Sequence, residues 1–133
     1  MVGLIWFVQV VHYPMFSLVG TDAFSQYESV HQRLTTYIVA PLMLLELGTA
    51  IALVVNRPPE IPVASVWIAL ILVGVAWLST AVLQIPAHNA LQSGFDDTIH
   101  QRLVSTNWIR TIAWTGRGLL VVSWFATLIG SSK

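Results

Sequence analysis

Four long apolar stretches dominate this chain and constrain its fold more than any other feature. They cover residues 1–19, 34–55, 63–85 and 103–129. A helix needs about 20 consecutive, mostly apolar residues to cross the hydrocarbon core of a bilayer. The composition agrees, because 56% of the 133 residues are hydrophobic and 9% are charged, with a mean hydropathy of +0.74. The sequence therefore predicts an all-α integral membrane protein, a four-helix bundle in a single transmembrane domain over residues 1–133.

The composition also excludes several classes of function. The formal net charge is +0, so no basic surface indicates a nucleic-acid partner. The absence of cysteine excludes disulfides, thiolate nucleophiles, iron–sulfur clusters and thiolate zinc sites. Any metal must therefore be bound by nitrogen and oxygen. The first residues lack the positive region of a cleavable signal peptide, so we expect the first apolar stretch to be a retained membrane segment.

A seven-residue phrase occurs twice, directly before or at the start of the second and fourth apolar stretches. It reads ESVHQRL over residues 28–34 and DTIHQRL over residues 97–103. In each copy a carboxylate precedes a histidine by three residues, which places both side chains on one face of a helix, one turn apart. Four-helix bundles build dinuclear metal centres from such pairs. We therefore expect two equivalent pairs of metal ligands, Glu28 with His31 and Asp97 with His100.

The repeat also predicts the architecture of the bundle. Two helical hairpins, over about 1–56 and 63–133, would be related by a twofold axis along the membrane normal. The break between them is the segment 56–62, whose three prolines no helix could cross.

Two polar segments, 21–33 and 88–102, are expected to extend the helices that follow them. Asp22 and Asp96 are the expected N-caps, because a carboxylate there accepts free backbone N–H groups of the first turn. The helices would then carry His31 and His100 above the membrane surface.

The other two histidines, His12 and His88, lie close to prolines near the ends of the first and third apolar stretches. In a parallel repeat all four histidines collect toward one membrane face. The expected metal ligands are His12, Glu28, His31, His88, Asp97 and His100. These donors suit two divalent ions of iron, manganese, zinc or copper. The alternative is that the two phrases only cap helices at a membrane surface, where a carboxylate favours the positive end of the helix dipole.

Several further polar residues are candidates for binding a cofactor or substrate. Glu46 lies within an apolar stretch, where an unpaired carboxylate is costly, so we expect an ion pair with Arg110 or Arg117. The same two arginines could instead hold an acidic ligand or a quinone oxygen. The cofactor-binding candidates are Arg33, Arg102, Asn107, Arg110, Arg117 and Glu46.

Three kinds of function are compatible with these residues. The first is a membrane metalloprotein with a dinuclear centre, an oxidoreductase or oxygenase that acts on a lipophilic substrate from the bilayer. The second is a haem-binding electron-transfer protein with two axial histidines. The third is a non-catalytic subunit of a larger membrane complex. Whether the protein is an enzyme stays open at this point.

The expected partners are the lipid bilayer and a lipophilic small molecule, within a homo-oligomer or a larger membrane complex and without nucleic acid. The expected location is a bacterial inner membrane. Arg57 and Lys133 lie on the side of the termini and Arg33 and Arg102 on the other, so the positive-inside rule gives a tie. If the latter pair belongs to the site, the site faces outward.

Short motifs in the first, third and fourth stretches resemble one family. They are His12-x-Pro14, Ile85-Pro86-x-His88-x-x-Leu91, and Trp108-Ile-Arg110 followed by Arg117. Together they are similar to the small four-helix integral membrane family that includes fungal and bacterial anthrone oxygenase-like proteins. The resemblance implies a four-helix membrane fold and the oxygenation of a polycyclic phenolic substrate. The chain differs in having His88 where asparagine is more usual, and in its two carboxylate-x-x-His units.

Overall fold

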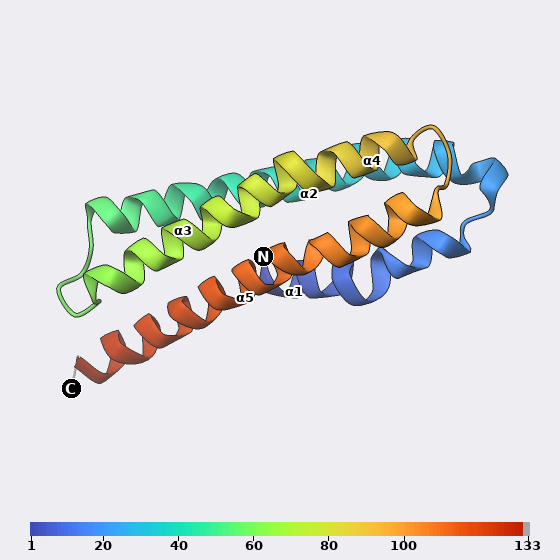
Figure 1. The fold of residues 1–133 in the computed structure, drawn as a ribbon. Helices are drawn as coiled ribbons and strands as arrows, with labels where there is room; N and C mark the ends of the chain where they lie inside the picture. The colour runs from blue at the N-terminus through green and yellow to red at the C-terminus, as the bar shows by residue number, and fades with distance from the viewer. Residues whose placement is uncertain (132–133) are drawn as a thin grey trace.

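The computed structural model describes residues 1–131, all of whose regular structure is helical (Figure 1). The elements in chain order are α1 (Val2–Phe7), the π-helix η1 (Val8–His12), the 3₁₀-helix η2 (Pro14–Leu18), α2 (Thr21–Val55), α3 (Val63–Ser79), the π-helix η3 (Thr80–Gln84), α4 (Ile85–Leu91) and α5 (Asp97–Ser131). Consecutive elements form four helical segments, and these confirm the predicted all-α, four-helix fold. Lys133, which entered the prediction of orientation, lies outside the described residues.

Three of the four segments are long and apolar enough to cross a membrane. They are Thr21–Val55, Val63–Leu91 and Asp97–Ser131, whereas Val2–Leu18 is a shorter apolar segment. Many large apolar side chains on the long helices point outward, among them Leu45 (63% exposed) and Leu119 (67% exposed). Such a surface is unfavourable in water and suits contact with lipid. These helices indicate an integral membrane protein.

The proline-rich segment after α2 ends that helix as predicted, since α2 stops at Val55. Asp96 is the predicted N-cap of α5, because its Oδ1 accepts a hydrogen bond from the Ile99 N–H at 2.9 Å. The prediction for Asp22 was wrong: α2 begins one residue earlier, at Thr21, and Gly20 is its N-cap. Asp22 therefore lies inside the first turn.

The polar segments extend the helices only in part. Residues 21–33 belong to α2 as predicted, but residues 88–91 continue the preceding helix as part of α4. The connection from α4 to α5 is short and turns at Gly94. The φ of Gly94 is 143°, a backbone conformation that residues with a side chain rarely adopt. His88 is consequently on the third segment and not on the fourth.

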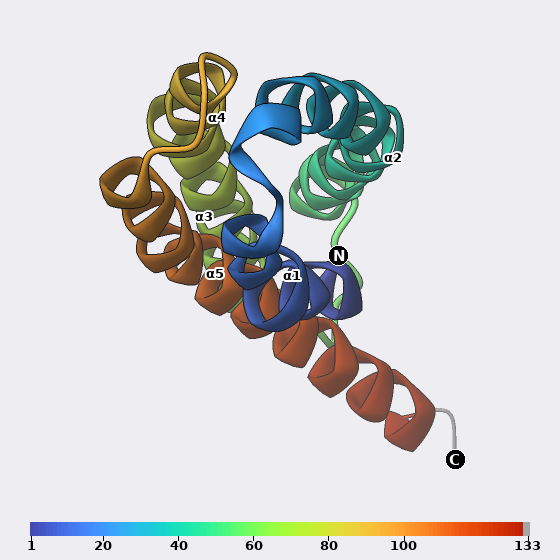
Figure 2. The ribbon, with the colours of Figure 1, turned by 90° about the vertical axis from the view of Figure 1, so that its right-hand side faces the viewer.

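The predicted twofold repeat is not shown by the structure. In the described chain α5 packs along α3 and also contacts α1 and α4, whereas the backbone of α2 approaches only α3 and α4 (Figure 2). Two cavities lie where α2 faces α1 and α5. One, of about 490 Å³, is lined mainly by α2 and α5, and the other, of about 250 Å³, by α1, α2 and the segment from α3 to α4. Polar side chains cross this side of the bundle.

Candidate metal centre

The four histidines come together at the end of the bundle where α1–η2 joins α2 and α4 joins α5 (Figure 1). At their centre lies Phe16 of η2, which is fully buried. Its ring centroid is 5.1 Å from that of His31, 5.3 Å from His12, 6.1 Å from His88 and 6.2 Å from His100. The predicted collection of all four histidines is therefore present, around an aromatic residue that the sequence did not single out.

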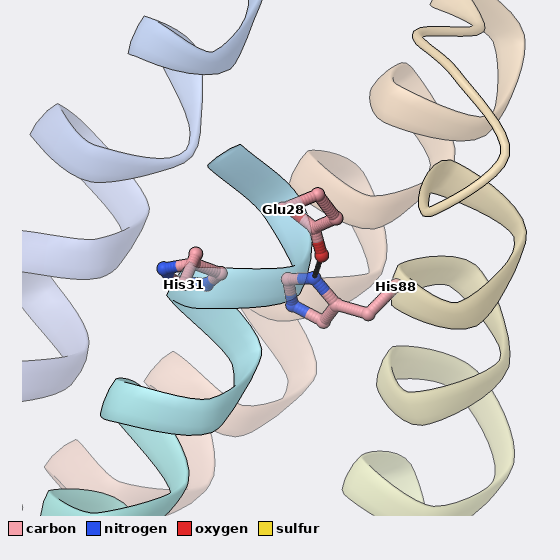
Figure 3. A group of neighbouring side chains, drawn as sticks. All are labelled: Glu28, His31 and His88. Carbon is pink, nitrogen blue, oxygen red and sulfur yellow. Dashed lines mark hydrogen bonds and ion pairs between the residues drawn. The ribbon is translucent and has the colours of Figure 1, made fainter. Parts of the chain in front are cut away.

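Three of the predicted ligands form one group that could hold a metal ion: Glu28, His31 and His88 (Figure 3). Glu28 and His31 are one turn apart on α2, and His88 reaches toward them from α4. One ligand atom from each residue lies within 4.8 Å of the others. Glu28 is fully buried and both histidines are 9% exposed, so the group is almost closed to solvent.

His88 uses both ring nitrogens within this group. Its Nδ1 is 2.5 Å from Oε1 of Glu28, and its Nε2 is 2.9 Å from the hydroxyl of Tyr13. A consistent assignment has Nδ1–H donating to the carboxylate and the Tyr13 O–H donating to Nε2. A metal bound by both Glu28 and His88 would replace the proton between them.

Glu28 has one oxygen without a partner. Oε1 receives His88 and, at 3.4 Å, the side-chain amide of Gln32, but Oε2 is buried with no hydrogen-bond partner among residues 1–131. A buried carboxylate oxygen left unpaired is costly, and native structures rarely retain one without a reason. A bound cation would satisfy it.

His31 is oriented by its neighbours through one nitrogen. Nδ1 is 3.0 Å from Nε2 of His12 and 3.1 Å from Oγ1 of Thr35. If Nδ1 carries the proton, Nε2 keeps its lone pair for a metal, which is the usual arrangement for a ligating histidine. His12 therefore contacts a candidate ligand and does not itself belong to the group of three.

The second copy of the phrase is placed differently. Asp97 is exposed, and its Oδ2 accepts a hydrogen bond from Gln101 at 2.7 Å. His100 is buried, but its Nε2 donates to the backbone carbonyl of Tyr13 at 2.8 Å. The structure thus places neither residue in the group, and His100 instead fixes the backbone between η1 and η2.

The cofactor-binding candidates divide between the surface and the interior. Arg33 and Arg102 are exposed. Asn107 and Arg110 are buried on α5, where the Arg110 Nη1 donates to the Asn107 Oδ1 at 3.1 Å. Asn107 in turn donates to the side chain of Gln9 at 2.9 Å, a buried polar residue that the sequence analysis missed. A glutamine within an apolar stretch was the available signal.

Glu46 forms the predicted ion pair with one of the two arginines, Arg117. The Arg117 Nε donates to Oε2 of Glu46 at 2.7 Å, and its Nη2 donates to Thr49 at 3.1 Å. The pair lines the larger cavity and not the one beside the histidines. It joins α2 to α5 where their backbones are not in contact.

The smaller cavity, of about 250 Å³, adjoins the three-ligand group. His31, His88, Tyr13 and Arg110 line it together with largely apolar side chains, which include Ile5, Val8, Val39, Met43, Trp77 and Ile85. Polar side chains of Gln32, Thr35, Thr36, Thr80 and Gln84 also line it, although most of its wall area is apolar. A concave site with largely apolar walls and several polar groups is the usual form of a small-molecule site.

Comparisons of this chain with protein-family models, curated proteins and solved structures found no match. The resemblance to the anthrone oxygenase-like family therefore stays a prediction, and the interpretation of the site depends on its own geometry.

Proposed function

We propose that this protein is an integral membrane metalloprotein that binds a divalent transition metal through Glu28, His31 and His88, and that it is an oxidoreductase acting on a lipophilic substrate. The observation that carries the metal site is the fully buried Glu28 carboxylate, with one unpartnered oxygen, beside two imidazoles. Buried charges are normally paired or coordinate metals.

The donor set indicates the type of metal. Two histidines and one carboxylate are the ligands of non-haem iron(II) oxygenases, and also of catalytic zinc sites. Both kinds of site leave coordination positions open for water, dioxygen or substrate. The oxygenase resemblance of the sequence favours iron within this proposal.

The proposal contains one metal ion at this group. Of the six ligands expected from the sequence, His12 serves to orient His31, His100 holds the Tyr13 carbonyl, and Asp97 faces outward. The carboxylate within the group argues against the haem alternative, since a haem with two axial imidazoles needs no anionic ligand there.

The adjoining cavity supports a lipophilic substrate. Its walls are mainly apolar, and His31 and His88 belong to both the cavity and the metal group. A molecule dissolved in the bilayer would therefore meet the open metal positions in apolar surroundings, where water is excluded and electrostatic interactions are strong.

Metal content and spectra test the proposal directly. The purified protein, depleted of metal with a chelator in detergent, is titrated anaerobically with iron(II) and, separately, with cobalt(II) as a spectroscopic probe. We expect one equivalent of either ion, cobalt absorption typical of nitrogen and oxygen ligands, and no Soret band. Absence of saturable metal binding, or isolation of the protein with haem, would overturn the metal site.

A further inference from the structure

Arg110 is a buried cation without a carboxylate partner in the described part of the chain. Its side chain is 6% exposed, and no acidic group among residues 1–131 lies within 4.0 Å of it. Its Nη1 donates to Asn107, but its Nε has no hydrogen-bond partner among the described residues. Arg117, seven residues later on the same helix, has Glu46 as a counterion.

A polar network holds Arg110 in place without neutralising it. The Gln9 Oε1 accepts hydrogen bonds from Asn107 at 2.9 Å and from Thr111 at 3.2 Å, and the Gln9 Nε2 donates to the Val104 carbonyl at 3.1 Å. Because the Asn107 amide nitrogen is engaged by Gln9, its oxygen is directed to Arg110. Every member of this network is neutral except the guanidinium.

Arg110 lines the same cavity as the metal group. The Tyr13 hydroxyl, which bonds to His88, also lies close enough to Arg110 to interact with it electrostatically. A lone cation in an apolar cavity is unfavourable unless an anion joins it. A divalent ion bound at Glu28 would more than neutralise that carboxylate, which increases the need for a negative charge in the cavity.

We propose, as an extension of the proposed function, that the cavity binds a lipophilic monocarboxylate. Its carboxylate accepts hydrogen bonds from the Arg110 guanidinium and lies beside Tyr13, and its apolar chain lies against the walls formed by α1, α2 and α3. A single negative charge suits Arg110, which among the described residues is the one arginine or lysine side chain that lines the cavity. The planar fork of a guanidinium matches the two oxygens of a carboxylate.

The test uses the full chain in detergent, kept free of metal with a chelator, so that anion binding is measured apart from the metal site. The probe is a terminally brominated ten-carbon carboxylate, with the matching brominated alcohol as the neutral comparison. Bromine quenches the fluorescence of Trp77, which lines the cavity. The part of the saturable quenching that disappears in the Trp77→Phe variant reports binding in this cavity.

We expect the carboxylate to bind at least about tenfold more tightly than the alcohol, as a charged hydrogen-bonded pair in apolar surroundings allows. Arg110→Met should remove this preference, whereas Arg110→Lys should keep part of it. Arg102→Met, which removes an exposed arginine two turns earlier on the same helix, is the matched control and should bind like the wild type.

Equal affinity of the wild-type protein for the carboxylate and the alcohol would overturn the proposal, and this result needs no folded variant. An unchanged preference in Arg110→Met would overturn it as well. Metal binding with no carboxylate preference would contradict this inference alone. A carboxylate preference in a protein that binds no metal would contradict the metal proposal alone.

Discussion

The two copies of the repeated phrase, residues 28–34 and 97–103, lie on helices of 35 residues each but in opposite environments. In both, the glutamine four residues after the carboxylate donates to it, at 3.4 Å in the first copy and 2.7 Å in the second. In both, the histidine is buried. Yet Glu28 is fully buried and Leu34 is exposed, whereas Asp97 is exposed and Leu103 is fully buried.

Helix geometry explains this inversion. The carboxylate and the leucine are six residues apart, which separates them by about 120° around the helix, with the histidine three residues from each. A different rotation of each helix about its axis keeps the histidine inside and exchanges the other two positions. The same local sequence therefore supplies a candidate metal ligand on α2 and a core leucine on α5.

The beginning of each helix contributes to the difference. α2 starts at Thr21, so Glu28 lies two turns inside it, whereas α5 starts at Asp97 itself, next to the Asp96 cap. A carboxylate in the first turn is stabilised at the surface by the helix dipole. Glu28 lies beyond the reach of this stabilisation, and its burial beside His88 is consistent with the proposed role as a metal ligand.

The largest expected effect distinguishes the two carboxylates. Glu28→Gln should weaken metal binding by about 100-fold or more, because a neutral amide oxygen replaces the carboxylate, the one anionic donor among the three proposed ligands. Asp97→Asn is the matched control and should leave affinity unchanged. If metal titration showed equal losses of affinity in both variants, the symmetric dinuclear centre expected from the sequence would be the better description of the site.

The two histidines should separate into a ligand and a structural residue. His31→Ala should lose metal while the bundle stays folded. His100→Ala should retain metal but lose about 1 kcal/mol of stability, since the hydrogen bond to the Tyr13 carbonyl disappears. Metal analysis and thermal unfolding of the metal-free proteins measure both quantities. Loss of metal in His100→Ala without a change in unfolding would contradict this division of roles.

A third carboxylate, Glu46, extends the comparison along α2, since it is paired with Arg117 where Glu28 has a free oxygen. A double-mutant cycle of Glu46→Gln and Arg117→Met should give a coupling free energy of about 1 kcal/mol for unfolding. This value is lower than for a fully buried ion pair, because the Glu46 side chain is 28% exposed and solvent screens the interaction. Glu46→Gln with Arg110→Met should be additive. Reduced metal affinity in Glu46→Gln would show that this pair is not independent of the site.

The smallest effect concerns the helix starts. Asp96→Ala should cost about 1 kcal/mol of stability through loss of the N-cap. Asp22→Ala, within the first turn of α2 and not at its cap, should cost less. Thermal unfolding of both variants decides the order. A larger loss of stability in Asp22→Ala would contradict the expectation that the N-cap residue contributes more than a carboxylate within the first turn.

The sequence by itself determined the helical fold, its main break and the end of the bundle at which the histidines collect. Long apolar stretches and the prolines after Val55 act locally, so they need no knowledge of the neighbours. The cost of a charge in lipid likewise made a partner for Glu46 predictable, although not which arginine.

Only the tertiary structure decided which copy of the phrase supplies the candidate ligands. The backbone of α5 approaches α1, α3 and α4, and Leu103 is buried in the core there, whereas the backbone of α2 approaches only α3 and α4 and reaches α1–η1 and α5 through side chains such as His31 and Glu46. The contacts of Tyr13 and Phe16 with the histidines also depend on this packing. The rotation of a helix about its axis is set by the elements it packs against, which a seven-residue pattern does not contain.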